Sequence, residues 1–120
     1  MKIAVAQFNP TVGDIDGNLN KLLGALPLCK EQGAGLVVFP ELFLTGYPPR
    51  DLLKRPGIMR LVSAAIKKIE TASRSFPELG ILFGAPLPSG RNIGAGLFNT
   101  AFLAENGFIT FSQHKMLLPT

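Results

Sequence analysis

The stretch Leu36-Val37-Val38-Phe39-Pro40-Glu41 decides the fold. Its apolar residues are typical of a short buried strand, and Pro40 ends that strand because proline has no amide hydrogen for a sheet. Glu41 follows directly and is the only charged residue between Glu31 and Arg50. In open sheets flanked by helices, ligands collect at the carboxyl ends of the strands, so Glu41 lies where a functional site is expected.

The residues before this strand predict a β-α-β unit. Residues 2–8 are mostly apolar and stop at Asn9-Pro10, which is typical of a largely buried strand inside a sheet. An amphipathic helix is expected next, because capping residues precede apolar residues at helical spacing. The capping residues are Asp14, Asp16 and Asn18, and the apolar ones are Leu19, Leu22, Leu23, Leu26 and Cys29. Pro27 is expected to kink or break this helix, since an interior proline costs about 3 kcal/mol.

The residues after Glu41 predict a second helix and three further strands. Residues 46–56 read as a loop, and residues 58–69 carry apolar residues at helical spacing. Residues 80–84 form a buried strand, followed by a loop over residues 86–96 that is rich in proline and glycine. Two strand-like runs, at 97–104 and 108–113, then flank the dipeptide Asn106-Gly107, which favours a tight hairpin turn. The fold class is therefore α/β, with part of the sheet antiparallel.

Composition excludes several classes of protein. The 120 residues are 47% hydrophobic and 17% charged, and no linker or internal repeat divides them, which fits one globular domain. The net charge of +4 raises the question of nucleic acid, but the basic residues are scattered and form no stripe with aromatics. No run of 18 apolar residues predicts a membrane span, and residues 1–8 do not resemble a secretory leader. We expect a cytoplasmic protein without nucleic-acid or membrane partners.

Two residue types that often carry chemistry have ordinary interpretations here. Cys29 is the only cysteine, so it forms no internal disulfide, and its position on the apolar stripe of the first helix favours packing over catalysis. His114 is the only histidine and has no second ligand at metal-binding spacing. No metal site is predicted.

Lys115 resembles Glu41 in its isolation, because it is the only formally charged residue after Glu105. A carboxylate among apolar residues has its charged form disfavoured, which suits a general acid or base. An ammonium group can stabilise a developing oxyanion. The alternatives are that Glu41 caps a backbone amide or pairs with an arginine, and that Lys115 extends its stem over apolar surface with its head in water.

Two motifs resemble those of nitrilase-superfamily amidases, the carbon-nitrogen hydrolases. Residues 37–47 (VVFPELFLTGY) are similar to the family's glutamate motif and residues 114–119 (HKMLLP) to its lysine motif, while residues 6–14 (AQFNPTVGD) resemble its first strand and helix start. The resemblance implies an α-β-β-α sandwich, of which this chain is the N-terminal portion only. It also implies a cysteine nucleophile with Glu41 as general base and Lys115 at the oxyanion, and Tyr47 lining the substrate pocket.

A longer match narrows the resemblance to glutamine-dependent NAD synthetases, through residues 45–53 (TGYPPRDLL) and Lys115 with residues 116–120 (MLLPT). The implied function is release of ammonia from glutamine for amidation of nicotinic acid adenine dinucleotide. Residues 1–120 would then be a partial amidase domain without cofactors, and ATP and magnesium would act in a synthetase domain absent from these residues. The expected partners are glutamine, the rest of the synthetase chain and other protomers of a homo-oligomer.

The apolar stretch after Lys115 resembles an interrupted sequence rather than a natural terminus, and the nucleophile is expected beyond it. We therefore expect the 120 residues alone to be inactive. Two alternatives stay open, namely another nitrilase-superfamily amidase and an inactive binding or scaffolding module in which Glu41 and Lys115 have lost their roles. Short glycine pairs at residues 33–35 and 94–96 do not extend into a nucleotide-binding motif.

Overall fold

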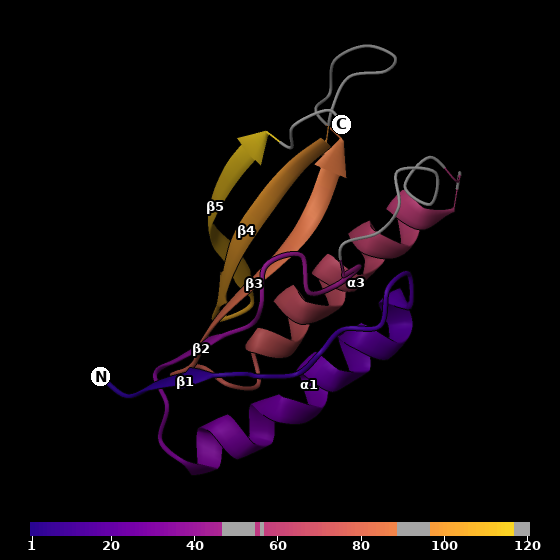
Figure 1. The fold of residues 1–120 in the computed structure, drawn as a ribbon. Coiled ribbons are helices and arrows are strands. Elements are labelled where there is room, and N and C mark those ends of the chain that lie inside the picture. Colours follow the sequence, from indigo (N-terminus) through magenta and orange to yellow (C-terminus); the bar gives the residue numbers. More distant parts are fainter. Residues whose placement is uncertain (47–54, 56, 89–96, 117–120) are drawn as a thin grey trace.

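The computed structural model describes residues 1–46, 55, 57–88 and 97–116. Its centre is one five-stranded sheet in the order β1-β2-β3-β4-β5, with two long helices, α1 and α3, on one side (Figure 1). The first three strands are parallel and the last two are antiparallel to their neighbours. This confirms the predicted α/β class and its mixed sheet.

The predicted β-α-β unit is present as β1 (Ile3–Val5), α1 (Ile15–Glu31) and β2 (Leu36–Val38), with β1 and β2 parallel. The Asp14 side chain caps α1 by accepting a hydrogen bond from the Gly17 amide at 3.0 Å. Such a cap satisfies one of the amides that have no partner inside a helix, which explains why α1 begins here.

Two expectations for this unit were wrong. The first strand does not lie inside the sheet: β1 forms its edge, and Ile3 and Val5 are 56% and 66% exposed. Residues 2–8 predict a buried strand because they are apolar on both faces, but among the described residues only the face of β1 toward the helices is covered. Pro27 does not interrupt α1, which continues to Glu31 with Pro27 exposed. On that outer face, water can solvate the carbonyl whose helical hydrogen bond the proline removes.

The second half contains α3 (Ile58–Ser73), β3 (Gly80–Pro88), β4 (Leu97–Glu105) and β5 (Phe108–Met116). The β4–β5 turn has positive φ at Asn106 (52°) and Gly107 (89°), which confirms the predicted hairpin. The predicted loop over 86–96 begins too early, because β3 continues through Pro86 to Pro88. β2 pairs with β3 only at residues 80–82, so beyond them one side of β3 is an edge, where prolines are tolerated.

A bulge changes the phase of β5. Ala104 pairs with Ile109 and Leu103 pairs with Phe111, so Thr110 has no partner in the ladder. The Thr110 hydroxyl donates at 3.5 Å to the carbonyl oxygen of Leu103. Because of the extra residue, Ile109 packs against the core while Phe111, Gln113 and Lys115 share the opposite face.

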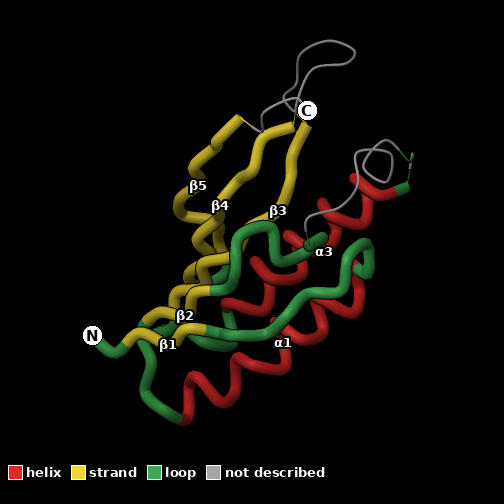
Figure 2. The backbone as a smooth tube through the Cα atoms, in the orientation of Figure 1, coloured by secondary structure: helices red, strands yellow, loops and turns green. Residues whose placement is uncertain are grey.

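Figure 2, in the orientation of Figure 1, shows both helices on the same side of the sheet. The core lies between these helices and that face of the sheet. Buried side chains from both layers meet there. They include Leu22 and Leu26 from α1, Val62, Ala65 and Ile69 from α3, and Val37, Ile81, Phe83, Phe102 and Ala104 from the strands. Among the described residues, neither helix is long and apolar enough to cross a membrane.

The second face of the sheet carries an apolar row that runs across all five strands. By register it consists of Val5, Val38, Leu82, Leu103 and Phe111, and we call it the open-face row. Val5 is 66% and Phe111 is 53% exposed, while the three inner residues are half-buried. In the described part of the chain, the molecule therefore has a helix layer and a sheet layer, two consecutive layers of the expected sandwich.

Candidate active site

Glu41 and Lys115, far apart in the sequence, line one pocket of about 300 Å³. The pocket lies on the same sheet face as the open-face row, beside β3, β4 and β5. The register places Gly84, Ala101 and Gln113 in one cross-strand row, and Asn99 and Lys115 in the next row. Side chains of matching rows share a face, so these residues surround the position of Glu41.

Glu41 is positioned by a tight turn that follows β2. The Phe43 amide donates to Pro40 O at 3.1 Å, and the Gly46 amide donates to Leu42 O at 2.8 Å. Leu42 has a φ of 54°, in the left-handed region that a leucine rarely adopts and that costs about 1–2 kcal/mol. Burial of Phe39 before Leu42, and of Phe43 and Leu44 after it, offsets that cost, so buried apolar side chains hold the turn on both sides of its strained residue.

A glycine in β3 allows this turn to approach the sheet. A Cβ atom added to Gly84 would lie 2.7 Å from the backbone nitrogen of Leu42, closer than real Cβ contacts. The Gly84 carbonyl also accepts a hydrogen bond from the Leu44 amide at 3.3 Å. The turn therefore rests directly on the β3 backbone, and Gly84 is required for that contact.

Asn18 links the same turn to the start of α1 and is fully buried. Its Oδ1 accepts from the Thr11 amide at 2.8 Å, and its Nδ2 donates to the carbonyl oxygens of Thr11 and Leu44, both at 2.9 Å. One amide side chain thus joins the turn to the segment before α1, where the Gly13 amide also donates to Thr45 O at 3.0 Å. Asn18, expected from the sequence as a helix cap, instead joins two loops, and Asp14 provides the cap.

The Glu41 carboxylate accepts a hydrogen bond from the Asn99 amide Nδ2. Asn99 is only 7% exposed, whereas Glu41 itself is exposed, so the expectation of a buried Glu41 among its apolar neighbours was wrong. The sequence neighbours Phe43 and Leu44 pack in the core, while Glu41 lines the pocket on the other side of the sheet. A carboxylate there can reach a ligand in the pocket.

Lys115 lies on β5 directly across the ladder from Asn99 and is exposed. The neighbouring His114 points to the other face, where its Nδ1 lies 2.9 Å from the hydroxyl oxygen of buried Thr100. Within the described ranges, no three side chains of histidine, cysteine, aspartate or glutamate gather as metal ligands would. The groups brought together are therefore one carboxylate, one ammonium and two amides, the last from Asn99 and Gln113.

The other predicted residues are not part of this pocket. Tyr47 lies outside the described residues, as does most of the predicted loop at 46–56. Cys29 is 8% exposed on α1 and packs in the core on the helix-covered face. Burial raises the pKa of the Cys29 thiol above its ordinary value of 9.0, which disfavours the reactive thiolate.

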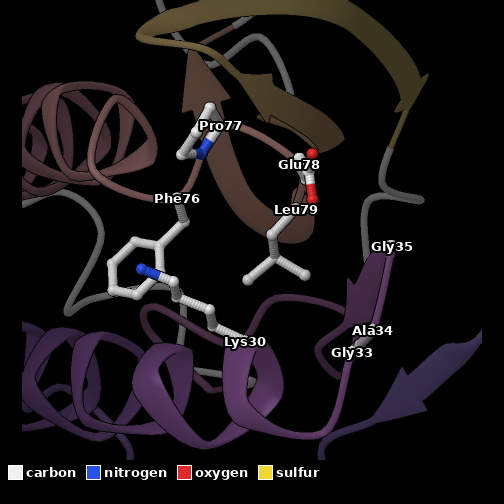
Figure 3. A pocket seen from close by; sticks show the side chains of 8 residues that line it. All are labelled: Lys30, Gly33, Ala34, Gly35, Phe76, Pro77, Glu78 and Leu79. Carbon is white, nitrogen blue, oxygen red and sulfur yellow. The ribbon is translucent and has the colours of Figure 1, made fainter.

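A second pocket, of about 290 Å³, lies at the opposite ends of the strands. Figure 3 shows Lys30, Phe76 and Leu79 around this space, between the end of α1 and the segment that leads into β3. Glu78 also lines it, but no nucleophile or amide side chain does. The Glu41 pocket is the better candidate site. It brings together a possible acid–base group, Glu41, which follows the carboxyl end of β2, and a cation, Lys115.

Sequence reasoning missed Asn99 and Gly84. Asn99 lies in a largely apolar strand, and asparagine is depleted in strands, so its position was a usable signal. Gly84 gave no such signal, because glycine at the end of a short apolar run reads equally well as the start of a loop.

Comparison with known proteins identifies the family. The model of the carbon-nitrogen hydrolase family matches residues 2–120, nearly the whole chain. The chain belongs to the carbon-nitrogen hydrolase family. Family membership agrees with the glutamate and lysine motifs and with the α/β architecture around them.

The most similar relatives in this family include glutamine-dependent NAD(+) synthetases. The chain is 39% identical over 121 residues to the enzyme of Synechocystis sp., covering 98% of the chain and 21% of that enzyme. It is 41% identical over 118 residues to the enzyme of Acinetobacter baylyi, covering 98% of the chain and 20% of that enzyme. The chain therefore spans about a fifth of the length of the curated relatives it matches.

Solved structures of the family share the fold. An amidase from Nesterenkonia sp. superposes with a TM-score of 0.83 at 29% identity, over 100% of this chain and 44% of the amidase. The glutamine-dependent NAD+ synthetase of Acinetobacter baumannii gives a TM-score of 0.77 at 30% identity, over 98% of this chain and 21% of that enzyme. A mutant of the Nesterenkonia amidase shows covalent addition of the acetamide moiety of fluoroacetamide at the active site cysteine.

Proposed function

We propose that this chain forms part of the glutamine amidohydrolase unit of a glutamine-dependent NAD synthetase. The observation that carries the proposal is the pocket that unites Glu41 with Lys115 on one sheet face, in a family of carbon-nitrogen hydrolases. The similarity to several NAD synthetases over nearly the whole chain supports glutamine as the amide substrate. The ammonia released would amidate nicotinic acid adenine dinucleotide in another part of the enzyme.

In the proposed mechanism a cysteine from outside these 120 residues attacks the side-chain carbonyl carbon of glutamine. Glu41 takes the thiol proton as the carbon–sulfur bond forms, and Lys115 stabilises the negative charge on the carbonyl oxygen. When the carbonyl re-forms, the carbon–nitrogen bond breaks and Glu41 returns the proton to the departing ammonia. Water then attacks the thioester, with Glu41 again as base, to give glutamate and the free thiol.

We also propose that this unit needs no cofactor, whereas ATP and magnesium act in the synthetase part. A cytoplasmic location, a homo-oligomer and Tyr47 at the glutamine pocket belong to the same proposal. The single cysteine agrees with a reducing compartment, the exposed residues of the open-face row offer apolar surface to another protomer, and the resemblance of residues 45–53 to NAD synthetases supports Tyr47.

The test is a graft in which this chain replaces the aligned segment of the Synechocystis synthetase. We expect the graft to form NAD+ from glutamine, and to form it from ammonium salts as well. Activity with ammonium alone would show a folded synthetase with a non-functional amidase unit, and would contradict the proposal.

Two substitutions in the graft test the assigned roles. Glu41→Gln and Lys115→Met are each expected to lower glutamine-dependent turnover by at least about 100-fold, since each removes a proton acceptor or an oxyanion partner. Ammonium-dependent synthesis should be unchanged, and Lys67→Met on the exposed side of α3 should alter neither rate. Retention of glutamine-dependent turnover by Glu41→Gln would remove Glu41 from the mechanism.

The isolated 120-residue chain is expected to release no ammonia from glutamine. Its only thiol lies in the core on the helix-covered face, and burial raises the pKa of Cys29. The measurement is ammonia production by the purified chain, with the graft as positive control. Measurable production that disappears in Cys29→Ala would show that Cys29 can act as the nucleophile.

A further inference from the structure

We infer that Asn99 is a positioning residue that holds the Glu41 carboxylate in the orientation required for proton transfer. The inference rests on the proposed function, because it assigns a role relative to Glu41 as the base. It concerns a residue that belongs to neither the glutamate motif nor the lysine motif, and it follows from three features of the pocket.

The first feature is direct contact. The Asn99 Nδ2 donates to Glu41 Oε1, so an amide fixes the position of this carboxylate oxygen. An exposed glutamate side chain otherwise samples several rotamers, and its carboxylate would occupy the reactive position only part of the time.

The second feature is the rigidity of Asn99 itself. Its side chain is 7% exposed and projects from β4, a strand paired on both sides, with Pro86 of β3 across one ladder and Lys115 of β5 across the other. A group placed on a central strand moves less than one placed on a loop, and Glu41 lies on a turn. Asn99 therefore ties the turn-borne Glu41 to the rigid sheet.

The third feature is chemical type. An asparagine amide donates a hydrogen bond without adding charge, so it can hold a carboxylate without forming an ion pair. An arginine or lysine at this position would form an ion pair with Glu41, and an aspartate would repel it. Asparagine is thus suited to hold a base next to the cationic Lys115.

The direct test uses side-chain amide signals of the 120-residue chain in ¹⁵N-resolved NMR spectra. Asn99→Asp identifies the Asn99 signal by its loss. We expect that signal to shift in Glu41→Gln, because its carboxylate acceptor becomes a neutral amide, and to remain in place in Gln113→Ala, which changes another side chain of the pocket. An unchanged chemical shift of the Asn99 signal in Glu41→Gln would overturn the inference.

The kinetic test uses the graft and two matched changes of charge. Asn99→Asp keeps the side-chain shape but replaces the donor with an acceptor, and Asn20→Asp makes the same chemical change at an exposed position of α1, away from the pocket. We expect Asn99→Asp to lower kcat for glutamine about 10- to 100-fold with little change in KM and to alter the pH profile of kcat, while Asn20→Asp leaves both close to wild type.

Asn99→Ala should also lower kcat without raising KM, and ammonium-dependent synthesis should be unchanged in every variant. Equal effects of Asn99→Asp and Asn20→Asp would show that Asn99 has no special relation to Glu41, and would overturn the inference. If the unsubstituted graft does not use glutamine, the proposed function fails and the NMR result alone decides whether Asn99 orients Glu41.

Discussion

Asn18 connects the turn that carries Glu41 to the segment before α1 through its side-chain hydrogen bonds. It is fully buried and bonds to both Thr11 and Leu44. We expect Asn18→Ala to lower the free energy of unfolding by about 1–3 kcal/mol, because it leaves buried backbone groups without partners. Asn20→Ala, at an exposed position of the same helix, is the control and should change stability by less than about 0.5 kcal/mol. Urea unfolding measures both, and equal effects would contradict the role of Asn18.

Cys29 should make stability depend on pH in the alkaline range. Burial raises the pKa of its thiol in the folded chain, so the folded state retains this proton at pH values where the unfolded state has lost it. The contribution of Cys29 to stability is therefore fully present below 9.0, the ordinary value, and is lost as pH rises through the folded value.

The measurement is urea unfolding of the wild type and of Cys29→Ala at several pH values from about 8 to about 10.5. The stability difference between the two proteins should shrink as pH increases. A difference that is constant across the range would show that the thiol titrates alike in both states.

For single residues, the sequence predicts which isolated charged side chains belong to the site better than it predicts the residues that contact them. Glu41 and Lys115 stand out because few other charges surround them in the chain, and the structure places both at one pocket. Asn99 was noticeable as a polar residue in a strand, but the sequence could not assign its role or that of Gly84, because both depend on a turn 40 or more residues away that folds against them. The exposure of Glu41 was missed for the same reason, since its apolar neighbours face the other side of the sheet.

Among the elements, the contact between the Glu41 turn and β3 gives a sharp steric prediction. Gly84→Ala places a methyl group 2.7 Å from the Leu42 backbone, so either the turn or the strand must shift. We expect a loss of about 1–3 kcal/mol in the free energy of unfolding. In the graft, glutamine-dependent turnover should fall more than ammonium-dependent synthesis, because the shift displaces Glu41.

Gly24 is the matched control for this substitution. It lies in α1, is exposed, and has nothing within 4 Å of an added Cβ. Gly24→Ala should raise stability by about 0.5–1 kcal/mol through higher helix propensity. If Gly84→Ala is as well tolerated as Gly24→Ala in thermal unfolding, the close approach of the turn is not required.

The elements themselves were largely predictable, since both described helices and all five strands fall where periodicity and turn residues predict them. The residues at which the strands begin and end were less predictable. β3 extends through two prolines because β2 is too short to pair with its second half, and that depends on a neighbour rather than on β3 itself. The bulge at Thr110 likewise has no local signal in the sequence, because it shifts the register between β4 and β5 by one residue and so depends on how the two strands pair.

For the whole molecule, the open-face row predicts self-association of the 120-residue chain. Val5 and Phe111 expose large apolar area on a sheet face that the helices do not cover. We expect Phe111→Lys to lower the apparent mass in light scattering at high protein concentration, because a charge in that row disfavours face-to-face contact. Leu28→Lys is the control, since Leu28 is 56% exposed, close to the 53% of Phe111, but lies on α1. Equal effects of the two substitutions would point to non-specific association.

The order of strands and the layer arrangement followed from the sequence only in part. The β-α-β unit and the hairpin were predictable from local patterns, because right-handed crossovers and tight turns leave few choices. Which face of the sheet the helices would cover was not predictable. Residues 36–39 are apolar on both faces of the strand, so no alternation of polar and apolar residues indicates which face the helices cover.

The bulge in β5 finally determines which chemical group faces Glu41. A regular ladder continued from the Ala104–Ile109 pair would set His114 opposite Asn99, whereas the unpaired Thr110 moves Lys115 into that position. One backbone residue, remote from the pocket, thus selects between an imidazole and an ammonium group. A shift of one residue in the pairing of β5 would place His114 instead of Lys115 opposite Asn99, although the amino-acid sequence would be unchanged.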